Sequence, residues 1–144
     1  MNIFKIIIFA ILTIFLSGFL SSCHSVGSNI NSLEKRLAYQ QVRVVKNNNY
    51  IFLVLPNRVF FNSNSANFTD QAYKTLDLVF ELTDRYEKSV IFAKGFAKNS
   101  TMAAERAHRV AQYLWKSEVN TSFIYSDVGY MPEIKNCVVI GFKK

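Results

Sequence analysis

Residues 89–114 read SVIFAKGFAKNSTMAAERAHRVAQYL, and this stretch decides the fold. The first part is apolar around one lysine and stops at Gly95, which predicts a strand closed by the glycine. In the second part apolar residues recur at helical spacing, and Ser100 or Thr101 is a suitable N-cap. That apolar stripe consists of Ala103, Ala107, Val110, Ala111 and Leu114. Because Arg106 borders the stripe, the stretch predicts a strand and an amphipathic helix with an arginine beside its buried face.

Further strands and a second helix flank this unit. Apolar runs on both sides of residues 46–49 (KNNN) predict a hairpin, and Thr69 followed by Asp70 predicts the start of a helix. The other predicted strands cover residues 42–45, 50–55, 123–130 and 136–142. The order β-β-α-β-α-β-β predicts an α+β sandwich in which a mixed sheet carries two helices on one face.

The start of the chain has the features of an export signal. Residues 3–20 carry a single charge, Lys5, and are otherwise almost entirely apolar. Such a run is long enough for a transmembrane helix, which is the alternative reading. Leu20-Ser21-Ser22-Cys23 resembles the lipobox of bacterial lipoproteins, in which two small residues precede a cysteine that receives lipid. This resemblance implies a signal peptide over residues 1–22 and a lipid on Cys23.

The lipobox has consequences for the rest of the chain. It makes Cys23 the first residue of the mature chain. The small and polar residues 25–31 predict a flexible tether, and residues 32–37 predict one short helical turn. Residues 23–40 are therefore expected to be a lipidated N-terminus and tether ahead of a folded domain at 41–144. His24 follows the cysteine where aspartate marks inner-membrane retention, so the resemblance implies the periplasmic face of the outer membrane. Cys137 then has no disulfide partner and is expected to be a small buried side chain.

Residues 50–142 resemble the OmpA-like C-terminal domain of porin-like proteins, peptidoglycan-associated lipoproteins and flagellar stator proteins. Residues 55–66 (LPNRVFFNSNSA) match the LP-x-x-V-x-F-x-x-x-S-A segment of that family, and residues 105–114 (ERAHRVAQYL) match its R-A-x-x-V-x-x-Y-L helix. Gly129-Tyr130, Pro132 and the strand at 136–140 match its last turn and strand. The resemblance therefore extends over about two-thirds of the chain and implies an OmpA-like domain.

This resemblance also implies a ligand site. Family members bind peptidoglycan noncovalently: an aspartate pairs with the ammonium of diaminopimelate, and the arginine of the R-A helix pairs with its carboxylate. Arg106 stands at the arginine position, whereas Lys98 replaces the aspartate and the loop that follows is shorter. The candidate ligand residues are Arg106 for one carboxylate and Lys98 for a second. The residues alone leave two alternatives open, since Arg106 could pair with Glu105, Asp127 or a carbonyl and Lys98 could be a solvated loop residue.

Composition and missing motifs narrow the functional class. No H-E-x-x-H, G-x-S-x-G or glycine-rich phosphate loop is present, and the carboxylates are scattered, so we expect neither an enzyme, nor a cofactor, nor a metal site. The chain has a net charge of +7, but an exported protein does not meet nucleic acid. The expected partners are the outer membrane, envelope or secretion-complex proteins, and peptidoglycan.

Two functions follow from these features. The first is a cell-envelope scaffold, which resembles a small lipoprotein subunit of a type IVB (Dot/Icm) secretion core complex. The alternative is a wall anchor of the peptidoglycan-associated lipoprotein type.

The lipobox makes a direct prediction about the mature protein. Mass spectrometry of the protein extracted from membranes should find Cys23 at the amino terminus with an acylated thiol, while Cys137 stays unmodified. An unprocessed amino terminus with a free thiol at position 23 would contradict the predicted membrane anchor.

Overall fold

The computed structural model describes residues 26–86, 90–116, 124–129 and 134–144. The predicted leader, Cys23 and the outer ends of two predicted strands, at Ser89, Phe123 and Tyr130, lie outside these residues. The elements are α2 (Val26–Tyr39), β1 (Arg43–Lys46), β2 (Tyr50–Pro56), α3 (Asn57–Phe60), α4 (Asp70–Thr83), β3 (Ile91–Phe96), α5 (Ser100–Lys116), β4 (Ile124–Val128) and β5 (Cys137–Lys143).

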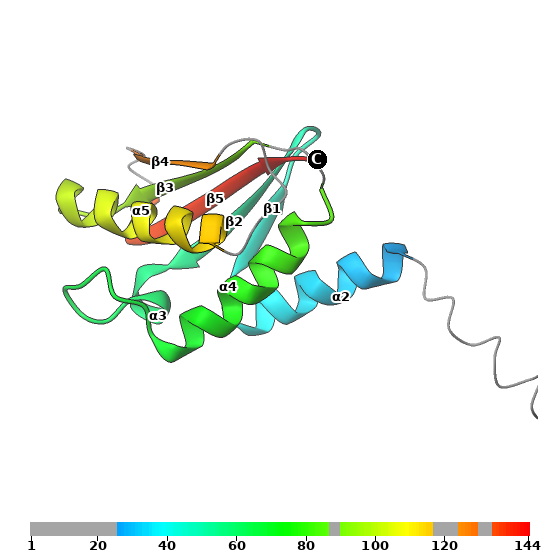
Figure 1. The fold of residues 1–144 in the computed structure, drawn as a ribbon, viewed down its shortest axis with the longest axis horizontal. Coiled ribbons are helices and arrows are strands. Elements are labelled where there is room, and N and C mark those ends of the chain that lie inside the picture. The colour runs from blue at the N-terminus through cyan, green and yellow to red at the C-terminus, as the bar shows by residue number, and fades with distance from the viewer. Residues whose placement is uncertain (1–25, 87–89, 117–123, 130–133) are drawn as a thin grey trace, which may run out of the picture.

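A five-stranded mixed sheet forms the centre of the fold (Figure 1). The strand order is β1-β2-β5-β3-β4, in which β3 and β4 are parallel and all other neighbours are antiparallel. The last strand, β5, lies in the middle, and α5 is the crossover between the two parallel strands. The predicted α+β class with a mixed sheet is therefore confirmed.

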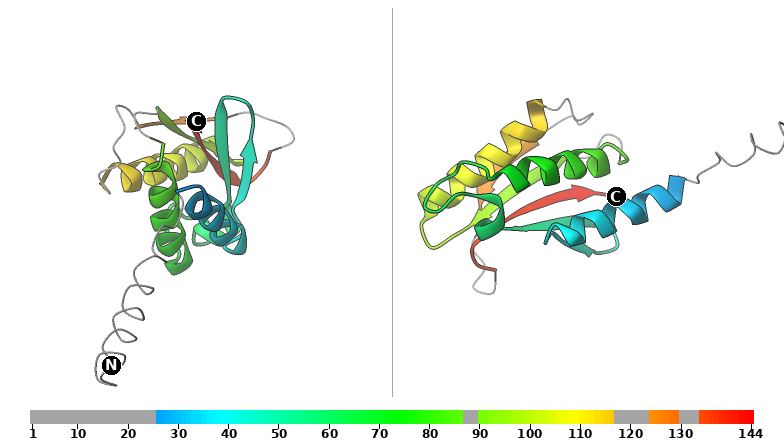
Figure 2. Two further views of the ribbon diagram at one scale, coloured as in Figure 1. Left: turned by 90° about the vertical axis from the view of Figure 1, so that its right-hand side faces the viewer. Right: turned by 90° about the horizontal axis from the view of Figure 1, so that it is seen from below.

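Three helices cover one face of the sheet, one more than the sequence predicted (Figures 1 and 2). Alternate residues of each strand point to this face. They share a single hydrophobic core with apolar side chains of α2, α4 and α5. The largest fully buried members are Leu33, Leu37, Ile51, Leu53, Leu55, Phe60, Leu76, Leu82, Ile91, Leu114, Ile140 and Phe142.

The additional helix is α2, which occupies residues where a flexible tether was predicted. Leu33 and Leu37 are one helical turn apart, fully buried, and belong to the common core. The sequence pattern missed most of α2 because the small polar residues at its start have weak helical preference. A short helix is stabilised mainly by packing its apolar face, which a local pattern does not reveal.

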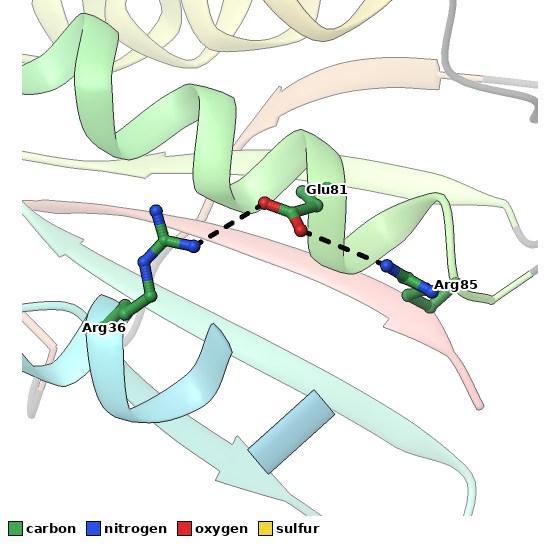
Figure 3. A network of polar contacts seen from close by, with 3 residues as sticks. All are labelled: Arg36, Glu81 and Arg85. Carbon is green, nitrogen blue, oxygen red and sulfur yellow. Dashed lines mark ion pairs between the residues drawn. The ribbon is translucent and has the colours of Figure 1, made fainter. Parts of the chain in front are cut away.

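Ion pairs also join α2 to its neighbours. Figure 3 shows the carboxylate of Glu81 on α4 between two arginines, Arg36 of α2 at 3.9 Å and Arg85 at 4.0 Å. Lys46 Nζ of β1 lies 2.6 Å from Glu34 Oε1 of α2. The more exposed pairs of Glu81 contribute about 0–1 kcal/mol each, whereas the Glu34 side chain is only 18% exposed. The burial of Leu33 and Leu37 is the main apolar contribution to the attachment of α2.

The predicted helix starts are correct to within one residue. Thr69 caps α4 as predicted, because its side-chain oxygen accepts a hydrogen bond from the Ala72 amide at 3.2 Å. The predicted cap of α5 at Ser100 or Thr101 is wrong. Asn99 takes that role, since its Oδ1 accepts from the Met102 amide at 3.2 Å. Asparagine and serine are equally good caps, so composition alone does not choose between adjacent positions.

The sequence predicted that Gly95 ends its strand, but the glycine lies within β3, which continues to Phe96. A Cβ at this position would lie 1.9 Å from the carbonyl oxygen of Ala103. The glycine therefore allows α5 to pack its backbone directly against the sheet. Gly141 in β5 is also covered, but there the nearest atom is the ring Cζ of Phe92, at 2.1 Å.

These two glycines predict different responses to the same substitution. Gly95→Ala should lower the free energy of unfolding by about 2–3 kcal/mol or more, because the clash is with helix backbone that cannot move alone. Gly141→Ala should cost less, because the Phe92 ring can rotate aside. Urea unfolding followed by circular dichroism measures both, and equal losses would contradict the close approach of α5 to β3.

Candidate functional site

The loop between α3 and α4 is shaped by asparagine and serine residues. Phe61 and Phe68 form an isolated antiparallel bridge at its base, and the Asn62 amide donates to the Asn67 carbonyl at 2.9 Å. Asn64 adopts a positive φ of 49°, a conformation that asparagine tolerates better than most residues. We call residues 61–68 the asparagine loop. Its closed shape turns the Ser65 carbonyl toward α5.

Arg106 of α5 holds this loop. Its Nε donates to the Ser65 carbonyl oxygen at 2.9 Å, and its guanidinium carbon lies 5.2 Å from the ring centre of Phe61. Of the structural partners considered from sequence, the structure therefore selects a carbonyl. The arginine is half-buried, as its place beside the apolar stripe of α5 predicts.

Asn57, the first residue of α3, is a second partner that sequence reasoning missed. It is only 5% exposed. The side-chain amide of Asn57 satisfies its neighbours when its oxygen faces the donors around it. In that orientation the oxygen accepts from Arg106 Nη1 and from the Cys137 amide, both at 3.2 Å. No local pattern could reveal this contact, because Asn57 and Arg106 are far apart in sequence and meet only through tertiary packing.

Arg109 lies one turn beyond Arg106 and holds the same loop. Its Nη2 donates to the side-chain oxygen of Asn67 at 3.1 Å. A hollow of about 320 Å³ adjoins this contact, and its lining residues are Ala66, Glu105, His108, Arg109 and Gln112. Two arginines of α5 thus face the asparagine loop, and each is held by an uncharged oxygen.

Arg106 is a charged side chain whose hydrogen-bond partners are all neutral. Among the described residues it forms no ion pair, and its Nη2 makes no hydrogen bond. Burial lowers the pKa of Arg106, because desolvation disfavours the charged form, yet a guanidinium stays charged at physiological pH. A half-buried cation with neutral partners and spare donors is suited to bind an anion, and carboxylate matches its planar fork.

Lys98 lies apart from Arg106. It is exposed in the turn between β3 and α5, and it has no hydrogen bond or ion pair with any described residue. Ser100 and Arg106 are separated by about 9 Å along the helix axis at 1.5 Å per residue. The structure therefore brings Arg106 together with Asn57 and Ser65 but leaves Lys98 as a separate positive charge near the start of α5.

Two further residues that could carry chemistry are His108 and Cys137. His108 is exposed, and its Nδ1 lies 3.5 Å from the Ser126 hydroxyl. Cys137 is 4% exposed, as expected for a buried side chain, and burial raises the pKa of its thiol. Within the described ranges, no three His, Cys, Asp or Glu side chains gather as a metal site, and no helix is long and apolar enough to cross a bilayer.

This chain resembles several solved structures in its fold, at low sequence identity. A putative MotB-like protein from Desulfovibrio vulgaris superposes with a TM-score of 0.66 at 16% identity, covering 79% of this chain and 90% of that one. The cell wall anchor of the T6SS from Pseudomonas aeruginosa gives 0.61 at 15% identity, covering 78% and 94%. The OmpA-like domain of FopA1 from Francisella tularensis gives 0.51 at 14% identity, covering 69% and 77%.

The chain has the OmpA-like fold. No protein-family model matches the chain, and no curated protein matches it by sequence. The predicted OmpA-like architecture is thus confirmed at the level of the fold. The reading as a type IVB secretion subunit, like the lipoprotein called IcmN or DotK, gains no support from these comparisons and stays a prediction.

Proposed function

We propose that this protein is a non-enzymatic envelope protein, anchored by lipid on Cys23, whose OmpA-like domain attaches it to peptidoglycan. Arg106 binds a carboxylate of the stem peptide through its unused Nη2. The observation that carries this proposal is the half-buried guanidinium without a carboxylate partner among the described residues. One protein with this fold is described as a cell wall anchor, which supports the same role.

The arrangement of the domain supports a bridging function. The beginning of α2 and the asparagine loop lie at opposite ends of the molecule in Figures 1 and 2. A lipid on Cys23, just upstream of α2, would hold the first end at the membrane. The second end, with Arg106, would then point away from the membrane toward the wall.

Lys98 changes how the ligand is recognised. A lysine at the position of the family's aspartate would repel the ammonium of diaminopimelate, and like charges at close range cost free energy even when solvent screens them. We therefore assign both basic residues to carboxylates: Arg106 as the main anchor, and Lys98 as an exposed, weaker contact. This mode of binding depends on acidic groups of the stem peptide and should weaken with salt.

Sedimentation with purified sacculi tests the proposal. Arg106→Ala should reduce the affinity by about tenfold or more, the loss expected for a hydrogen bond to a charged group of about 1.5–3 kcal/mol. Arg106→Lys should recover only part of the binding, because an ammonium lacks the planar fork of a guanidinium. Lys98→Ala should have a smaller effect that disappears in high salt.

The matched control is Lys35→Ala, which removes an exposed positive charge from α2. Thermal unfolding of each variant separates a loss of binding from a loss of fold, since Arg106 also holds the Ser65 carbonyl. Retention of wild type and Arg106→Ala to the same extent would refute wall binding through Arg106. Absence of retention together with stable co-purification with core-complex subunits would favour the secretion-subunit reading.

A further inference from the structure

The sheet face opposite the helices contains a trough along the central strand. On this face β5 presents three small residues, Cys137, Val139 and Gly141, because side chains alternate along a strand. The strands on both sides present larger ones, with Phe52 on β2 and Phe92 on β3. These small side chains between bulky neighbours leave a hollow centred on Val139, which we call the trough, whereas the Phe92 ring covers β5 at Gly141.

The trough has a volume of about 510 Å³. Its described lining residues are Arg43, Val45, Phe52, Val54, Phe92, Lys94, Phe96, Gly129, Ile134 and Val139. The rings of Phe52 and Phe92 lie 6.1 Å apart, and Tyr50 stacks on Phe52 at 6.1 Å. No helix of the described residues covers this face (Figures 1 and 2). Apart from Arg43 and Lys94, the described lining is apolar.

Two positive charges flank the trough at the same level. Arg43 pairs with Val54, Val54 with Val139, and Val139 with Lys94 across four neighbouring strands. At about 4.8 Å per strand, the two basic residues are about 14 Å apart at their backbones, on either side of the floor. Long side chains from both sides can therefore reach one group placed above Val139.

Local contacts show where these charges lie. Lys94 Nζ is 5.9 Å from the ring centre of Phe92. Burial raises the pKa of the Cys137 thiol, and the charge of Arg43 partly opposes that rise, so Arg43 is within electrostatic reach of the floor. Neither Arg43 nor Lys94 forms an ion pair with a described residue. The described lining contains no carboxylate, although Asp127, whose Oδ1 accepts from the Val128 amide at 2.7 Å, pairs in register with Lys94 on the neighbouring strand β4.

The apolar lining and the two flanking positive charges favour one kind of ligand over the others. An apolar floor disfavours the polar glycan and stem peptides of the wall, and a flat bilayer surface cannot enter a groove walled by aromatic rings. A second copy docked through the same face would set Arg43 and Lys94 against their own counterparts. An extended protein segment with alternating apolar and acidic side chains matches both the floor and the flanking charges.

We propose that the trough along β5 binds an acidic, extended segment of a partner protein, with apolar side chains on the floor and carboxylates held by Arg43 and Lys94. The surface is separate from the Arg106 site, so one domain can engage the wall and a protein at the same time.

Fluorescence anisotropy with two labelled probes tests this proposal on the purified full-length protein. One probe is a capped seven-residue peptide of alternating valine and glutamate, and the other replaces each glutamate with lysine. The glutamate probe should bind saturably, and Arg43→Glu combined with Lys94→Glu should weaken it by tenfold or more. The same double variant should gain binding of the lysine probe.

Controls separate the trough from general charge effects. Lys35→Glu combined with Lys74→Glu makes the same change in net charge on exposed positions of α2 and α4 and should leave binding of the glutamate probe unchanged. Arg43→Gln with Lys94→Gln, checked by thermal unfolding, serves if the charge reversal disturbs the sheet. Trough variants should keep wild-type retention on sacculi, so this proposal and wall binding through Arg106 fail separately.

Three results would overturn the proposal. The first is equal binding of the glutamate probe by wild type and both trough variants. The second is binding of anionic phosphatidylglycerol vesicles, or of sacculi, that is lost in the trough variants while the glutamate probe does not bind. The third is a dimer in sedimentation equilibrium that the trough variants dissociate.

Discussion

A half-buried guanidinium held by neutral oxygens is the constraint around which the end of this domain that contains the asparagine loop is organised. Arg106 joins three segments that are distant in sequence: α5, the asparagine loop and the first residue of α3. Each contact satisfies a donor of the arginine without neutralising its charge. A cation in this state keeps its charge and an unused donor, which is why a carboxylate is the ligand proposed for it.

The two faces of the sheet differ in what they pack against. One face carries α2, α4 and α5 and provides the core that makes the domain stable. The other carries the trough along β5, where small residues leave room between aromatic walls. Because Leu33 and Leu37 of α2 pack into the same core, residues where a tether was predicted form a helix that belongs to the domain.

The sequence was most informative where local periodicity and packing agree. The stripe on α5, the Thr69 cap and the hairpin around residues 46–49 all form as predicted, because each depends on neighbours within one or two turns of chain. The position of Arg106 at the border of that stripe also predicted its partial burial. Local reasoning was therefore sufficient for the type of these elements and for the partial burial of Arg106, whereas its role as a ligand residue is implied by the family resemblance and stays a prediction.

Contacts between distant segments could not be predicted in this way. Asn57 meets Arg106 only because α3 and α5 pack together, and the burial of Leu33 and Leu37 requires α4 to be in place. The trough depends on strand register, which aligns Arg43 with Val139 and Lys94 through three separate pairings. The order of elements followed from periodicity, and the replacement of the family's aspartate by Lys98 was already visible in the sequence.

Isotope-edited NMR of the arginine Nε–H groups, during titration with a soluble muropeptide that carries a diaminopimelate stem, tests the central claim most directly. The account predicts a saturable shift of the Arg106 resonance, while that of Arg36 on α2, at the other end of the domain, stays in place. A muropeptide that binds without moving Arg106, or that shifts neither resonance at saturating concentration, would contradict it.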